Sequence, residues 1–148
     1  MTGYRLGWII ANKAFINQIR NLSMNFYLSP SSISQYVAKK VFNYYAYFDS
    51  IVLKYLENRN YLINKLHSLG IRDIILPKGA FYLYVSCEGF INKRLKDGKK
   101  INNDMDFAEY LLQDAKVAVV PGIAFGKSPF FRISYATSFE DLEEACKR

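Results

Sequence analysis

The chain has 148 residues, of which 51% are hydrophobic and 16% aromatic, so it can build a sizeable core, and a disordered chain is excluded. Its formal charge of +7 comes mostly from scattered basic residues, a distribution that does not indicate a nucleic-acid partner. No apolar run approaches the roughly 20 residues of a membrane-spanning helix, and the first residues lack a secretory signal, so we expect a soluble cytoplasmic protein with no membrane partner.

The first third of the sequence predicts one strand followed by two helices. Residues 5–12 are rich in Leu, Trp and Ile, as in a strand that is buried on both faces. Apolar residues then recur at helical spacing from Lys13 to Leu22, and a short helix is expected over 33–42, where Ser31 and Ser32 offer capping hydroxyls.

The remaining two thirds predict helices and short strands. A long helical stripe over 48–69 ends at Gly70, a natural helix stop, and residues 71–87 indicate a strand, a turn and a second strand. Asn103 or Asp104 can cap a helix to about Lys116. Further strands are expected over 117–120 and 130–134, and Ser138 can open a last helix that runs to Arg148.

The sequence contains one cluster of basic residues and few residues that could bind a metal. Asp97 and Gly98 interrupt the cluster, so we interpret it as a solvated loop. Its members are Lys93, Arg94, Lys96, Lys99 and Lys100. Cys87 and Cys146 lack metal-type spacing and suit free thiols in a reducing compartment, and the one histidine, His67, lies in a charged helical pattern at the surface, so no metal site is expected.

The first eight residues set Arg5 between Gly3 and Gly7. Glycine permits unusual backbone angles or the close approach of another group, and a guanidinium is a planar fork of donors suited to phosphate or carboxylate. A turn with an ordinary arginine salt bridge explains this pattern equally well when it is taken alone. Near the other end of the chain, residues 119–136 again set glycines and an arginine, Arg132, between strand-like apolar runs.

Five blocks in fixed order give the whole chain a resemblance to the C-terminal part of class I aminotransferases, which are fold-type I enzymes dependent on pyridoxal phosphate. The blocks are M-T-G-x-R-x-G-W at 1–8, S-x-S-Q at 32–35, P-x-G-A-F-Y at 77–82, P-G-x-x-F-G at 121–126 and F-R-I-S-Y-A at 131–136. The resemblance implies an α/β protein. Residues 1–47 would be a remnant of the large, cofactor-binding domain, with an exposed apolar strand near Ile9. Residues 48–148 would be an α+β small domain whose helices pack on one side of a mixed or antiparallel sheet of strands near 74, 83, 118 and 132.

The resemblance also assigns the site residues. Arg5 matches the arginine that pairs with the cofactor phosphate, and Arg132 matches the one that binds the substrate α-carboxylate. The lysine that forms a Schiff base with pyridoxal phosphate belongs to S-K-x-x-x-M-T-G-x-R-x-G and falls four residues before Met1, so this chain offers no catalytic residue and we expect it to be inactive alone. Lys13, Lys39 and Lys40 lie on expected solvated helix surface and cannot replace that lysine.

The function implied is therefore transfer of an amino group between an amino acid and a 2-oxo acid, in amino-acid metabolism, by an enzyme of which this chain is the C-terminal fragment. The M-T-G-x-R-x-G-W form favours an aspartate-type enzyme, and the family habit is a homodimer or, here, association with the missing N-terminal portion. Two alternatives stay open at this point. One is a non-catalytic remnant that acts only in dimerisation or docking, and the other is a basic nucleic-acid-binding module.

Overall fold

The computed structural model describes residue 1, residues 3–95 and residues 97–148. Thr2 of the first block and Lys96 of the basic cluster therefore lie outside the described residues. The chain divides into two compact units, Met1–Ser50 and Ile51–Arg148, and each is considered by itself. No helix of the described residues is long and apolar enough to cross a membrane.

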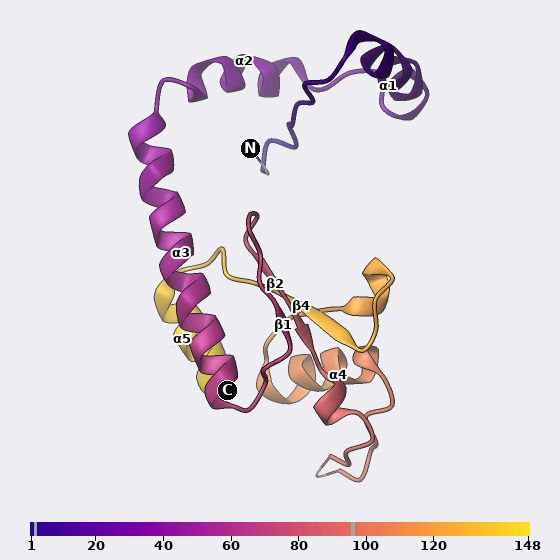
Figure 1. Ribbon diagram of the computed structural model, residues 1–148, viewed down its shortest axis with the longest axis vertical. Helices are drawn as coiled ribbons and strands as arrows, with labels where there is room; N and C mark the ends of the chain where they lie inside the picture. Colours follow the sequence, from indigo (N-terminus) through magenta and orange to yellow (C-terminus); the bar gives the residue numbers. More distant parts are fainter. Residues whose placement is uncertain (2, 96) are drawn as a thin grey trace. The chain divides into compact units, whose positions relative to one another are not determined.

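The first unit consists of a turn, a loop and helices (Figure 1). Both helices expected in this region are present: α1 is Lys13–Phe26 and α2 is Ser32–Val41, and the long helix α3, Tyr45–Ser68, starts before the unit ends. The Asn12 side chain caps α1 by accepting a hydrogen bond from the Phe15 amide at 2.9 Å. Ser31 is the N-cap residue of α2 but makes no side-chain capping bond, so its expected capping role is wrong.

The strand expected over residues 5–12 is absent, and this expectation is corrected. Gly3 to Arg5 form a turn, and the residues that follow are extended coil in which Ile9 and Ile10 are 60% and 92% exposed. A strand obtains its backbone hydrogen bonds from a neighbouring strand, and none of the described residues of the first unit provides one. The ring of Trp8 in this coil lies against that of Phe42, at 5.4 Å between ring centroids.

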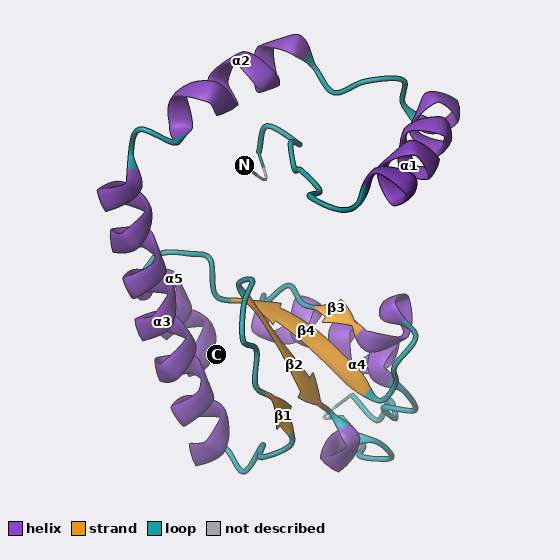
Figure 2. Cartoon of the chain, turned by 45° about the horizontal axis from the view of Figure 1, so that its top comes forward, coloured by secondary structure: helices purple, strands orange, loops and turns teal. Residues whose placement is uncertain are grey.

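The second unit is a four-stranded antiparallel sheet whose α-helices pack on one face (Figure 2). The strand order is β1-β2-β4-β3, with Leu83 paired to Ile133 and Tyr84 to Arg132. The expected helices on a small antiparallel sheet are thereby confirmed. The strands are β1 Ile74–Ile75, β2 Tyr82–Ser86, β3 Val120–Pro121 and β4 Phe130–Ser134, and the further helices are η1 Glu88–Phe90, α4 Asp104–Tyr110, η2 Leu111–Ala115, η3 Gly122–Phe125 and α5 Phe139–Lys147.

The core lies between one face of this sheet and helices α3, α4 and α5. Alternate strand residues, such as Leu83, Val85 and Phe131, point to this face, as the two-residue period of a strand requires. They join Leu62 of α3 and Leu142 of α5 in one buried cluster. The other face is left to Tyr82, Tyr84, Phe130 and Arg132.

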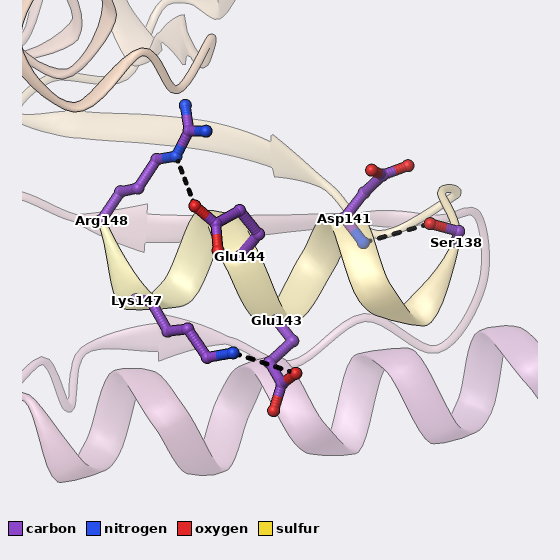
Figure 3. A network of polar contacts seen from close by, with 6 residues as sticks. All are labelled: Ser138, Asp141, Glu143, Glu144, Lys147 and Arg148. Atoms are coloured by element: carbon purple, nitrogen blue, oxygen red, sulfur yellow. Dashed lines mark hydrogen bonds and ion pairs between the residues drawn. The ribbon is translucent and has the colours of Figure 1, made fainter.

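Several helix ends behave as expected from the sequence. Gly70 follows α3 with a left-handed φ of 82°. Asn103 caps α4, and Ser138 caps α5 by accepting from the Asp141 amide at 3.1 Å, while Lys147 and Arg148 pair with Glu143 and Glu144 one turn earlier (Figure 3).

Strand β3 starts later than expected over 117–120. The reason is local, because α4 continues into the π-helical turn η2 and the Val117 amide donates to the Leu111 carbonyl instead of to a strand. His67 is exposed and both cysteines are free thiols, as the sequence indicated. The described residues of the basic cluster are also exposed, as expected of a solvated loop, and an isolated backbone β-bridge joins Arg94 to Lys100.

Candidate functional site

Arg132 lies at the centre of β4 on the sheet face that points away from the core. Its guanidinium is 4.2 Å from the ring centroid of Tyr82 and 4.3 Å from that of Phe125, so an aromatic ring contacts it from β2 and another from η3. The residue is half-buried, and within the described parts of the chain no oxygen accepts a hydrogen bond from its guanidinium, although its backbone is paired in the sheet. A guanidinium held by rings, with its donors still available, is suited to an anion.

The turn η3 presents Phe125 to Arg132 and is held closely against the sheet. The Tyr84 hydroxyl contacts the carbonyl oxygens of Gly122 at 2.9 Å and of Lys127 at 3.2 Å, one at each end of the turn. Gly126 follows with φ 76°, which ends the turn as a left-handed glycine cap. The P-G-x-x-F-G block therefore encodes a short, sharply bent turn.

Gly122 is required by the space around it. A Cβ atom at this position would overlap the carbonyl oxygen of Lys127 and lie 2.7 Å from that of Phe130. These are backbone atoms, which cannot move aside without shifting the turn. The glycine of the P-G pair thus allows η3 to lie against β4.

Asp104 is a residue of this region whose role the sequence did not reveal. Its side chain is 1% exposed, and its two carboxylate oxygens accept hydrogen bonds from the Ile123 amide at 2.7 Å and the Ser128 hydroxyl at 2.9 Å. Sequence reasoning considered it only as a cap of its own helix, whereas Asn103 performs that role. A single sequence gives no sign of a partner 19 residues away.

Burial raises the pKa of the Tyr84 hydroxyl, and the Asp104 carboxylate acts in the same direction, while the Arg132 guanidinium opposes them. A phenol is already protonated at neutral pH with its ordinary pKa, and the raised pKa extends the protonated range to higher pH. Tyr84 can therefore serve as the donor that its contacts with two carbonyl oxygens require.

The P-x-G-A-F-Y and F-R-I-S-Y-A blocks contact each other directly. The Tyr135 hydroxyl donates to the Ala80 carbonyl at 3.1 Å, and the Tyr135 amide donates to the Phe81 carbonyl at 3.0 Å. This holds a turn in which Ala80 has the left-handed φ of 60°, unusual for a residue with a side chain. The turn leads into Tyr82, one of the two rings on Arg132.

Arg5 lies in the first unit, in the turn that precedes the extended residues. Its φ is 54°, whereas neither Gly3 nor Gly7 has a positive φ, so the strained backbone falls on the arginine itself. Such conformations cost on the order of 1 to 3 kcal/mol and are concentrated at functional sites. An added Cβ at either glycine would meet nothing within 4 Å, so both glycines leave room beside Arg5.

The two arginines singled out from the sequence lie on different units, and each is described within its own. Lys13, Lys39 and Lys40 are exposed on α1 and α2, as expected. A lysine that does covalent chemistry is commonly held in a desolvated pocket, and none of these three is buried.

Comparison with known proteins gives a consistent result. The family described as aminotransferase class I and II matches residues 1–148. The chain is 44% identical over 149 residues to a Rickettsia bellii protein named "Probable aspartate/prephenate aminotransferase" and 40% identical to the aspartate aminotransferase of Rhizobium meliloti. Each match covers the whole of this chain. It covers only 37% of the first relative and 36% of the second, so the chain spans little more than a third of their length.

Solved structures give the same picture. The aspartate aminotransferase of Rhizobium meliloti matches with a TM-score of 0.80 at 41% identity, over 99% of this chain and 37% of that one. An aminotransferase from Mycobacterium tuberculosis also has a TM-score of 0.80, at 32% identity and with the same coverage.

Proposed function

Because the chain belongs to the class I and II aminotransferase family, we propose that it supplies the substrate-carboxylate site of an amino-acid aminotransferase, which transfers an amino group between an amino acid and a 2-oxo acid. The observation that carries this proposal is the environment of Arg132, whose guanidinium lies against two rings and has no acceptor among the described residues.

Arg132 would bind the α-carboxylate common to amino acids and 2-oxo acids. A guanidinium and a carboxylate are both planar, and two parallel hydrogen bonds fix the orientation of the carboxylate as well as its position. Contact with Tyr82 and Phe125 occupies the faces of the guanidinium that could otherwise stack elsewhere, so its donor edge is left for the substrate. Orientation matters because the reacting bond at the α-carbon must be aligned with the cofactor.

The cofactor of this family is pyridoxal phosphate, and Arg5 fits a role in holding its phosphate. The strained backbone at Arg5 and the open space at Gly3 and Gly7 support the assignment, as does the match of a guanidinium to a phosphate dianion. When bound, pyridoxal phosphate supplies an electron sink for the electrons of the substrate α-carbon. Arg5 would contribute binding and placement only.

The domain assignment belongs to the same proposal. Residues 1–47 would form part of the large domain and residues 48–148 the small domain, which is supported by the compact units Met1–Ser50 and Ile51–Arg148. The names of the relatives favour an aspartate-type substrate. A cytoplasmic homodimer is the arrangement that we infer from the family.

The proposal is tested by titrating L-aspartate into the ¹⁵N-labelled chain and following the Arg132 Nε–H signal by NMR. We expect weak, saturable binding that Arg132→Gln reduces about tenfold or more, since charge-assisted hydrogen bonds contribute roughly 1.5 to 3 kcal/mol each. The matched control is Arg72→Gln, which removes the same charge from an exposed loop position. Equal binding by the two variants would overturn the assignment of Arg132.

A further inference from the structure

We propose that Asp104 is a positioning residue for Arg132, acting through the turn η3 and the ring of Phe125. This inference rests on the proposed function of Arg132 as the residue that binds the substrate carboxylate. It assigns to a buried acid on α4 a part in substrate binding, although Asp104 would not touch the substrate.

The first step is that Asp104 directs both carboxylate oxygens to the segment that contains η3. One oxygen accepts from the Ile123 amide, inside the turn, and the other accepts from the Ser128 hydroxyl, just after it. Hydrogen bonds to a carboxylate are stronger than those between neutral groups, and at 1% exposure water does not compete for them. The carboxylate therefore fixes the spacing between Ile123 of the turn and Ser128 beyond it.

The second step is that the ring of Phe125 depends on this turn for its place. Phe125 is 49% exposed, so burial alone does not keep the ring on the guanidinium of Arg132. The backbone must present it, and Asp104 joins Ile123 of the turn to Ser128 beyond it, in addition to the Tyr84 hydroxyl and the turn's own backbone hydrogen bonds. A change of Asp104 is thus transmitted to the ring that orients Arg132.

The third step excludes a role limited to helix α4. The N-terminus of α4 is capped by Asn103, which accepts from the Asp106 amide at 2.9 Å. Asp104 sits in the first turn of the helix, but its hydrogen bonds leave the helix altogether. Loss of these bonds should leave the helix formed and loosen the turn.

The experiment compares the ¹⁵N-labelled chain with Asp104→Ala, Asp104→Asn and Phe125→Leu variants. The ring currents of Tyr82 and Phe125 should shift the Arg132 Nε–H signal, and Asp104→Ala should move that signal toward its position in Phe125→Leu and weaken L-aspartate binding about three- to tenfold. Asparagine can still accept from the Ile123 amide and donate to the Ser128 oxygen, so Asp104→Asn should restore most of both properties.

The double variant Asp104→Ala with Phe125→Leu should bind no more weakly than Phe125→Leu alone, because both changes act through one ring. Additive losses in this cycle would overturn the proposal, and so would an unchanged Arg132 signal in a folded Asp104→Ala chain. If Asp104→Ala does not fold, Ser128→Ala removes one of the two bonds, and an unshifted Arg132 signal in that variant counts against the proposal equally. Absence of L-aspartate binding by the unmodified chain would instead refute the function proposed for Arg132.

Discussion

Arg132 illustrates how one residue can be prepared for a ligand by its neighbours. The sequence placed it in a strand that follows a loop with two glycines, and the structure adds two rings that hold its guanidinium while leaving its donors available. Cation–π contacts contribute about 0.5 to 2 kcal/mol. This is enough to favour one rotamer of a long side chain, while the side chain can still adjust to a ligand. The residue is therefore oriented before any carboxylate arrives.

Cys87 gives a prediction about pH at the same scale. Burial, with a smaller effect of the Asp104 carboxylate, raises the pKa of the Cys87 thiol from 9.0 to about 11. Between these values the unfolded chain loses this proton and the folded chain keeps it. The contribution of this thiol to the free energy of unfolding is therefore fully present below pH 9 and is lost as the pH rises toward 11. We expect the free energy of unfolding in urea to fall by about 1.4 kcal/mol more between pH 8 and pH 10 in the unmodified chain than in Cys87→Ala. Equal changes in the two proteins would show that Cys87 is not the titrating group.

The candidate residues differ in how far the sequence could reveal them. Arg5 and Arg132 belong to local blocks of glycine and aromatic residues, so neighbouring positions identify them. Asp104 acts on Ile123 and Ser128, and such a long-range pairing leaves no local pattern in one sequence. The strain at Arg5 was equally hidden, since glycines on both sides suggested that one of them would take the left-handed conformation.

The turn η3 provides a prediction at the scale of a structural element. Gly122→Ala would place a methyl group against the backbone of Lys127 and Phe130, and we expect a loss of about 1 to 3 kcal/mol of stability, as is usual for overpacking. Chemical denaturation followed by circular dichroism measures the loss. Gly89→Ala is the matched control, because nothing lies within 4 Å of its added Cβ and its φ is not positive. A Gly122→Ala chain as stable as Gly89→Ala would contradict the close packing of this turn.

Elements that are stabilised locally were the most predictable. Helices α1, α3 and α5 follow apolar stripes with nearby capping or stop residues, and their positions agree with the sequence. Strands depend on partners distant in the chain, and the two errors in the placement of elements concern strands. Residues 5–12 have strand-like composition, but the described residues of the first unit offer no strand to pair with. In residues 117–119, the Val117 amide donates to the Leu111 carbonyl of η2 and not to a neighbouring strand.

At the scale of the whole molecule, the 148-residue polypeptide is expected to bind pyridoxal phosphate weakly at most and not to transaminate. Lys13, Lys39 and Lys40 are exposed, and hydrogen bonds from Arg5 at about 1.5 to 3 kcal/mol each do not offset the several kcal/mol needed to immobilise a ligand. The measurement is an absorbance scan with added cofactor, followed by borohydride reduction and mass spectrometry. Stoichiometric attachment to one lysine, with a spectral change on adding an amino acid, would show that another lysine has taken this role.

The strand order of the second unit also has a consequence for self-assembly. In the part of the chain that the structure describes, the two edge strands β1 and β3 are each two residues long, while the longer strands β2 and β4 lie between them. In a folded protein, a long free edge strand is the template onto which identical strands can add. Large apolar side chains are exposed on residues 1–50, but their contacts would join copies through side chains and leave both sheet edges unextended. Self-association of this chain should therefore give amorphous precipitate and not fibrils.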